Sequence, residues 1–190
     1  MSLFRKGFGN YPEYDDAPGA GSPPSPPATP AAALAGGWSP VSLSSSSSDT
    51  PSSRDFFSYV AFVTDGAGNV SPVSNMTPGT LDYHLGDVSD GTLACAGDNH
   101  VDIADVSLLG AHYGATLSSG SSFACLDVGP TTDRSVSARP TTDNLVGFED
   151  FMMFAINFSV VSSPEAARRA SVALANGSHL VVPSLTSPRW

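Results

Sequence analysis

The sequence predicts a mixed fold, a partial β-sandwich followed by a small α-helical module, with flexible Pro/Ser-rich segments. Residues 55–75 have strand composition around a glycine-rich turn. Residues 97–109 and 142–154 repeat one another, and each copy runs into an apolar stretch at helical spacing. With 18 glycines and 16 prolines in 190 residues, the chain is poorly suited to a large helical bundle. We therefore expect three regions: 1–80, 81–160 and 161–190.

The composition argues against several classes of function. A hydrophobic content of 41% supports a packed core, and 18 acidic against 8 basic residues give a net charge of −10. Binding to a nucleic-acid backbone requires clustered Lys and Arg, so nucleic acid is not an expected partner. No apolar run approaches the ~20 residues of a membrane span, and we expect neither a signal peptide nor a membrane anchor. A cation is the more natural partner of so acidic a chain.

The first region, residues 1–80, is expected to consist mostly of loops around one clear hairpin. The Pro-rich run 19–30 and the Ser run 44–48 predict loops or linker. Residues 57–63 have apolar side chains on both faces, as in the interior of a sandwich. A glycine-rich turn then leads to a returning strand, whose Pro72 favours an edge position because proline has no N–H to donate.

This hairpin, residues 59–72, resembles the last two strands of a fibronectin type III domain. A complete β-sandwich of that kind has about seven strands in roughly 100 residues, and only about 75 residues are available here. The resemblance therefore implies a partial domain, and we expect the chain to begin inside one. A carbohydrate-binding β-module is an alternative, for which Trp38, Tyr11 and Tyr14 are candidate aromatic contacts without a supporting spacing.

The central observation is an internal repeat at an offset of 45 residues within region 81–160. Residues 97–109 align with residues 142–154, and an Asp-Val pair precedes each copy. The identical aligned positions are Asp98 and Asp143, Asn99 and Asn144, Val101 and Val146, and Asp105 and Asp150. A short loop that delivers oxygen atoms from alternate residues, before a helix supplies the last carboxylate, suits a hard cation such as Ca²⁺. The repeat therefore predicts two calcium loops.

The first loop ends at Asp105 when it is numbered as an EF-hand with its last ligand at position 12. Its expected metal ligands are Asp87, Ser89 or Asp90, Asp98, the carbonyl oxygen of His100, Asp102 and Asp105. Asn99 occupies position 6, where the chain turns sharply, and Asn tolerates the positive φ that glycine normally supplies there. About seven residues around Cys95 must loop out between the third and fifth positions.

The second loop ends at Asp150 and has fewer side-chain ligands. Its expected ligands are Asp127, Asp143, the carbonyl oxygen of Leu145, and Asp150. Gly147 stands at position 9 and has no side-chain oxygen, so this loop is expected to recruit water, Asp133 or Glu149 and to bind more weakly than the first. Residues 82–150 carry 11 of the 18 acidic residues and two basic residues, and a cation would offset their repulsion.

Paired half-EF-hands of this kind, each a calcium loop followed by one helix, resemble a type I dockerin domain, and the resemblance covers region 81–160. It implies calcium-dependent docking onto a cohesin-like domain, in an extracellular bacterial multidomain protein linked to polysaccharide degradation or surface assembly. The chain departs from the family at loop positions 10 and 11. Cellulosomal dockerins usually carry Ser-Thr there, and this chain carries Ile103-Ala104 and Phe148-Glu149. The resemblance thus transfers calcium binding more directly than the choice of partner.

Simpler interpretations stand beside the calcium hypothesis. The acidic residues at the two helix starts are also typical of N-caps and first-turn charges. Both copies have apolar positions at the spacing of a core between two short helices. These positions are Val106, Leu109 and Tyr113 in the first copy and Phe151, Phe154 and Phe158 in the second. A calcium module without a docking partner would act as a rigid spacer between β-sandwich domains.

Neither catalysis nor a transition-metal site is expected. The chain has no nucleophile elbow, phosphate-binding glycine loop or His-Glu-x-x-His sequence, and its histidines are irregularly spaced among oxygen-rich neighbours. Cys95 and Cys125 fit no zinc spacing and form either one disulfide or two free thiols. We therefore expect a monomeric, non-enzymatic calcium module, followed in residues 161–190 by a linker and the start of a truncated domain.

Overall fold

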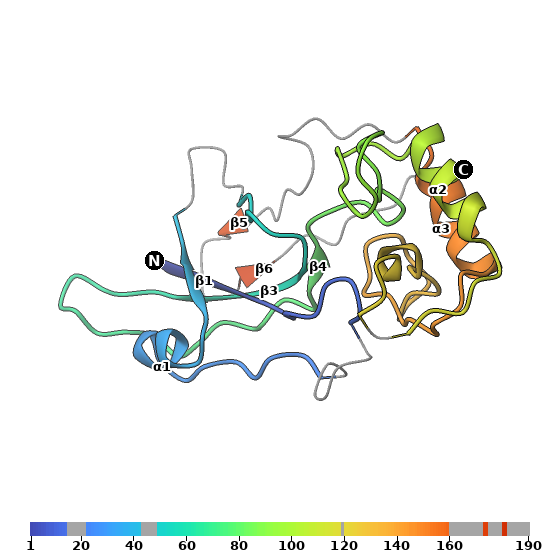
Figure 1. The fold of residues 1–190 in the computed structure, drawn as a ribbon. Helices are drawn as coiled ribbons and strands as arrows, with labels where there is room; N and C mark the ends of the chain where they lie inside the picture. Colours follow the sequence, from blue (N-terminus) through green and yellow to red (C-terminus); the bar gives the residue numbers. More distant parts are fainter. Residues whose placement is uncertain (15–21, 43–48, 119, 160–172, 175–179, 182–190) are drawn as a thin grey trace.

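The computed structural model describes residues 1–14, 22–42, 49–118, 120–159, 173–174 and 180–181. In chain order the elements are β1 (Ser2–Gly7), α1 (Pro30–Ala35), β2 (Ser39–Val41), β3 (Phe56–Phe62), β4 (Thr80–Leu81), α2 (Ile103–His112), the 3-10 helix η1 (Ala124–Leu126), α3 (Phe148–Asn157), β5 (Ala173–Leu174) and β6 (Leu180–Val181). Figure 1 shows the main sheet on one side of the molecule and the pair α2 and α3 on the other. No helix in these ranges is long and apolar enough to cross a membrane.

β3 is a central strand of the antiparallel sheet, whose order is β2-β1-β3-β4. All seven of its residues are buried. Because successive side chains of a strand point to opposite faces, the apolar residues after Phe56 divide between two apolar clusters. One cluster contains Val60 and Phe62, and the other contains Phe57, Tyr59 and Ala61. The prediction of a strand with apolar side chains on both faces is confirmed.

The segment after the turn is irregular, where the sequence predicted a returning strand. Thr64 and Val70 form an isolated bridge. Farther along, the main-chain N–H of Ser74 donates to the carbonyl oxygen of Ala61 at 2.9 Å, and the Ser74 hydroxyl accepts the Ala61 N–H at 2.9 Å. Two other hydroxyl residues, three positions to either side, make the same pair of bonds with Tyr59 in β3 and with Val63 just after it. Hydroxyl oxygens thus accept these N–H groups where a paired strand would offer main-chain carbonyl oxygens. Pro72 lies within the same segment and has no N–H to donate.

α2 and α3 pack against each other as an antiparallel pair (Figure 1). The N–H of Gly114, just after α2, donates to the carbonyl oxygen of Val146, just before α3, at 2.8 Å. In the matching contact, the N–H of Ser159, just after α3, donates to Val101, just before α2, also at 2.8 Å. The end of each helix therefore lies beside the start of the other. The 45-residue repeat of the sequence is a pseudo-twofold repeat of the structure.

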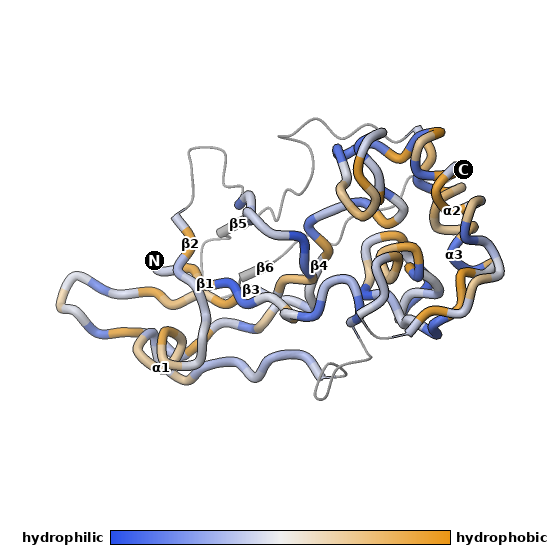
Figure 2. Tube along the Cα trace, viewed as in Figure 1, coloured by the Kyte–Doolittle hydropathy of each residue, from blue (hydrophilic) through white to orange (hydrophobic). Residues whose placement is uncertain are grey.

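One apolar cluster joins the N-terminal region to the helix pair. It extends from Tyr14 and Leu85 to Leu109 and Phe154, all of which are almost completely buried. Figure 2 shows hydrophobic segments in both the sheet and the helix pair. The regions that the sequence predicted as 1–80 and 81–160 thus share a core.

The predicted helix core is only partly buried. Leu109 and Phe154 are buried as predicted, but Tyr113 is 56% exposed and Phe158 is 45% exposed. Both are the C-cap residues of their helices, and their backbone (φ −59°, ψ 130°) has left the helical conformation. Their side chains therefore do not continue the buried face. Phe151 is also exposed, because it lies on the outer face of α3.

Parts of the predicted linkers and most of the last region lie outside the described residues. These are the Ser run 44–48, the start of the Pro-rich run 19–30, and all but four residues of 161–190. The four described residues of the last region form the antiparallel pair of β5 and β6.

Candidate metal centre

Each predicted loop is organised around an upstream aspartate whose carboxylate binds the main chain of the repeat. Asp87 accepts the N–H groups of Asp98 and Asn99 at 2.9 and 3.0 Å. At the matching place in the second loop, Asp127 accepts the N–H of Asn144 at 2.7 Å and, at a longer 3.4 Å, that of the preceding residue. Both insertions are therefore looped out, as predicted, and the first and fifth ligand positions of each loop lie together.

Asp105, the predicted last ligand of the first loop, connects the start of α2 to the upstream segment by hydrogen bonds. Its Oδ1 accepts the N–H groups of Val88 and Ser89 at 2.7 and 2.8 Å, and its Oδ2 accepts the N–H of Asp102 at 2.8 Å. Asp102 in turn caps α2 by accepting the N–H of Ala104 at 2.7 Å. The capping interpretation of these two acids is therefore confirmed as one of their roles.

Asp150 makes the corresponding contacts in the second loop. Its Oδ1 accepts the N–H groups of Val128 and Gly129 at 2.7 and 2.9 Å, and its Oδ2 accepts that of Gly147 at 2.6 Å. A Cβ at Gly129 would lie 2.6 Å from the main chain of Glu149, so only glycine allows this close approach. Gly147 offers no side-chain cap, and Asp150 therefore organises the start of α3 without the help that Asp102 gives to α2.

The sharp turn at position 6 has the predicted conformation in both loops. Asn99 and Asn144 have φ values of 70° and 64°. Asp98 accepts the N–H of the residue two positions on at 3.0 Å, and Asp143 does the same at 2.9 Å. Asx turns of this type stabilise a left-handed residue between the two partners. Asparagine therefore takes the place of the usual glycine, as the sequence predicted.

The predicted ligands fall into two groups by exposure. Asp87, Asp105, Asp127 and Asp150 are at most 3% exposed. The others lie at the surface or are half-buried, namely Ser89, Asp98, His100, Asp102, Asp143 and Leu145. A buried carboxylate loses hydration and requires hydrogen bonds and an opposite charge in compensation. The four buried carboxylates are therefore the groups of the two loops that most require hydrogen bonds and an opposite charge.

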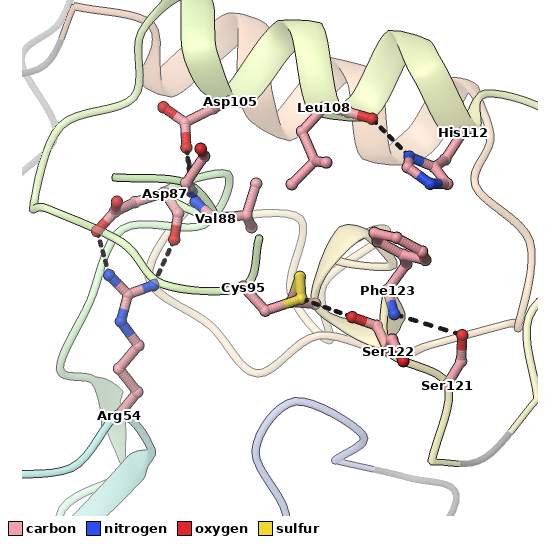
Figure 3. The surroundings of a disulfide bond; sticks show 12 residues. Arg54, Asp87, Val88, Cys95, Asp105, Leu108, His112, Ser121, Ser122 and Phe123 are labelled. Carbon is pink, nitrogen blue, oxygen red and sulfur yellow. Dashed lines mark hydrogen bonds and ion pairs between the residues drawn. A yellow bond between two sulfur atoms is a disulfide. The ribbon is translucent and has the colours of Figure 1, made fainter. Parts of the chain in front are cut away.

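In the first loop, a side chain from outside the repeat supplies an opposite charge to Asp87. Nη2 of Arg54 donates to Oδ2 of Asp87, and Nη1 donates to the carbonyl oxygen of the same residue (Figure 3). The guanidinium also lies over the ring of Tyr83, 5.2 Å from its centroid. Burial raises the pKa of Asp87, and the charge of Arg54 opposes that shift.

In the second loop, no ion pair of the described residues joins Asp127 or Asp150 to a basic side chain. Burial raises the pKa of Asp127 to about 7, and the charges of Asp150 and Asp143 add to the shift. Burial also raises the pKa of Asp150 to about 6, again with a contribution from Asp143. The three carboxylates thus repel one another, and a cation would relieve the repulsion.

The donor chemistry of the second loop fits a calcium ion, although the carboxylates alone do not form a complete site. Among the described residues, no three side chains of His, Cys, Asp or Glu converge as a metal-binding group. Ca²⁺ takes six to eight oxygen ligands and readily includes carbonyl groups and water. Asp127, Asp143 and Asp150 with the carbonyl oxygen of Leu145 would supply part of such a set. The first loop fits less well, because Arg54 already occupies the carboxylate of Asp87.

A disulfide between Cys95 and Cys125 settles the open question of the two cysteines. Cys95, which Figure 3 labels, lies in the insertion of the first loop, and Cys125 lies in η1, shortly before the second loop starts at Asp127. Next to it, the ring of Phe123 stacks on His112 of α2 with 3.8 Å between centroids. The disulfide therefore links the insertion of the first loop to the short helix that leads into the second loop.

Sequence reasoning missed Arg54, which lies 33 residues before its partner and in a different predicted region. The available signal was its isolation, because no other Lys or Arg occurs between Lys6 and Arg134. Comparison of the chain with protein-family models, curated proteins and solved structures finds no match. Functional inference therefore depends on the geometry of the two loops.

Proposed function

We propose that the chain is a non-enzymatic, calcium-binding module of dockerin type that attaches an extracellular multidomain protein to a partner. The observation that carries the proposal is the pseudo-twofold repeat of loop and helix, in which Asp105 and Asp150 have the same contacts. Two copies in one register support a common role that a single helix cap would not require. The proposed partner is a cohesin-like domain, and the proposed setting is polysaccharide degradation or surface assembly.

The mechanism is folding coupled to ion binding. Asp127, Asp143, Asp150 and the carbonyl oxygen of Leu145 would hold the ion. The ion would supply the positive charge that no ion pair of the described residues gives to the second loop. These residues come from the segment before α3 and from its first turn. Binding there would fix α3 against the upstream loop, because ligands that are brought together only in the folded state convert binding free energy into folding free energy.

The outer face of α3 supports the attachment role. Phe148 is 61% exposed and Ile156 is 52% exposed, and Phe151 and Met152 between them are also exposed. These positions have helical spacing, and the rings of Phe148 and Phe151 lie 6.4 Å apart. Contiguous exposed apolar side chains are typical of protein-interaction surfaces. The helix that calcium would fix is therefore also the helix that offers an apolar face.

A rigid spacer without a docking partner is the second candidate, and the shared core favours it. Tyr14 and Leu85 pack in the same cluster as Phe154 of α3. The side-chain amide of Asn157, at the end of α3, donates to the carbonyl oxygen of Leu85 at 2.8 Å. Such contacts would hold the β region and the helix pair in one orientation. The disulfide supports an extracellular location for either candidate, since disulfides persist in oxidising environments.

A calcium titration of chelator-treated protein by calorimetry, with circular dichroism at both ends, tests the proposal. We expect saturable binding that Asp150→Asn abolishes and that an equal concentration of Mg²⁺ does not reproduce. Capture of the chain by cohesin domains, in calcium but not in chelator, would then favour docking over the spacer. Binding of calcium without capture would favour the spacer. Absence of calcium binding would leave the carboxylates as structural hydrogen-bond acceptors and refute both candidates.

A further inference from the structure

We propose that the guanidinium of Arg54 is the resident cation of the first loop, so that the chain binds one calcium ion, in the second loop, and not two. This inference rests on the proposed calcium binding of the second loop. Arg54 would then determine both how many calcium ions the chain binds and which loop binds them.

The contacts of Arg54 are those of a fixed structural cation. It bonds both the carboxylate and the carbonyl oxygen of Asp87, which is completely buried, and its own side chain is 20% exposed. The carboxylate also accepts two main-chain N–H groups, so hydrogen bonds use most of its roughly four lone-pair positions. A calcium ion that used Asp87 would have to displace a paired guanidinium from a buried site.

The surroundings of Arg54 also keep the guanidinium in place. Its planar group lies over Tyr83, which is itself buried, in a cation–π arrangement. A Cβ at Gly97 would overlap both the guanidinium and Oδ1 of Asp87, so the glycine makes room for this pair. Arginine stays charged throughout the physiological pH range and binds a carboxylate in a defined geometry. The charge that the first loop receives is therefore permanent.

In the second loop, no basic side chain of the described residues makes the equivalent contact. Asp127 occupies the place of Asp87 and accepts N–H groups from the same two repeat positions. The described part of the chain has two ion pairs, Arg5 with Asp49 and Arg54 with Asp87, and neither involves Asp127. This asymmetry reverses the expectation from the sequence, in which the glycine at position 9 made the second loop the weaker one. The loop with fewer predicted ligands is therefore the one in which, among the described residues, neither buried carboxylate has an ion pair.

A calcium titration by calorimetry distinguishes one bound ion from two. It compares four proteins: the wild type, Arg54→Gln, Arg5→Gln and Asp150→Asn. Arg5 is a matched control, because its guanidinium also pairs with an aspartate, Asp49, and lies over an aromatic ring, that of Phe57, outside both loops. We expect one ion for the wild type and for Arg5→Gln, two for Arg54→Gln, and none for Asp150→Asn. Two ions in the wild type would overturn the inference and leave the calcium proposal intact.

A residue-specific readout covers the case in which Arg54→Gln does not fold. Calcium added to the ¹⁵N-labelled wild type should shift the amide signals of Gly129, Asn144 and Gly147 and leave those of Ser89 and Asn99 in place. Shifts in the first loop at the same calcium concentration would overturn the inference. A wild type that binds no ion by either method would refute the proposed function itself, which separates the two failures.

Discussion

Asp105 and Asp150, which lie 45 residues apart, each accept three main-chain N–H groups, and the donors occupy equivalent positions in the two repeats. Each carboxylate joins the first turn of its helix to the valine of the upstream Asp-Val pair and to the residue that follows it. These hydrogen bonds lie within the chain, so we expect both residues to organise their loops in addition to any role as calcium ligands. Their effect on stability is therefore separable from their effect on calcium binding.

Asp105→Ala should lower the free energy of unfolding by about 3 kcal/mol or more in chelator, because three N–H groups near the core lose their acceptor and each costs about 1–3 kcal/mol. The matched control is Asp98→Ala, which removes one hydrogen bond from an exposed side chain. We expect a loss below about 1 kcal/mol for the control. Urea denaturation of both variants measures the difference. Equal losses in the free energy of unfolding would contradict the role of Asp105 in connecting α2 to the upstream segment.

The stability of the chelator-treated protein should fall as the pH rises from about 4 to 7. In the unfolded chain an aspartate loses its proton near pH 3.9. In the folded chain burial raises the pKa of Asp127 to about 7 and that of Asp150 to about 6, so these groups still hold protons where the unfolded chain has released them. The unfolded state then binds fewer protons than the native state, and stability decreases with pH.

Denaturant unfolding in chelator at pH 5, 6 and 7 checks this trend. Asp127→Asn should flatten it, because the amide does not titrate. Calcium should also flatten it, since an ion bound to the carboxylates competes with their protons. A metal-free stability that rises steadily over this range would show that the two acids are stabilised in their ionised form.

Phe154→Ala and Phe148→Ala should differ strongly, although both change a phenylalanine of α3. Phe154 is completely buried in the shared core, and its truncation should cost about 3–5 kcal/mol. Phe148 lies on the exposed face, and its truncation should cost less than about 1 kcal/mol. Thermal or urea unfolding compares the two. A large loss for Phe148→Ala would mean that this face is covered within the chain and is not free to bind a partner.

Removal of the disulfide by Cys95→Ala together with Cys125→Ala should lower the free energy of unfolding by about 3–4 kcal/mol. The bond closes a loop with a sequence separation of 30 residues, and the chain-entropy treatment of a loop of that length gives this magnitude. Urea unfolding of the variant, compared with the oxidised wild type, measures the change. The wild type under reducing conditions should match the variant, and a change below about 1 kcal/mol would contradict a stabilising role.

The sequence predicted the local features of the candidate site well, because each is encoded by nearby residues. The repeat located both helices, the asparagines at position 6 identified the positive φ, and Asp102 identified the cap of the first helix, whereas the second helix begins after Gly147 without a side-chain cap. These features depend on backbone preferences and short hydrogen bonds, which act over a few residues.

Long-range features were not predictable in the same way. The pairing of Arg54 with Asp87 depends on how the N-terminal region packs on the first loop, and no local pattern specifies that contact. The shared core likewise joins Tyr14 to Phe154, which lie in different predicted regions. The exposure of Tyr113 and Phe158 follows from the backbone leaving the helix one residue early, a boundary that apolar spacing does not specify.

The central claim, that this fold binds calcium through its second loop, is tested most directly by equilibrium unfolding in chelator and in calcium. A ligand that binds only the folded state adds about 2.7 kcal/mol at a free concentration of 100 times its dissociation constant. We predict an increase of this order for the wild type in saturating calcium, and no increase for Asp150→Asn in the same buffer. Identical unfolding curves for the wild type in chelator and in calcium would contradict the account.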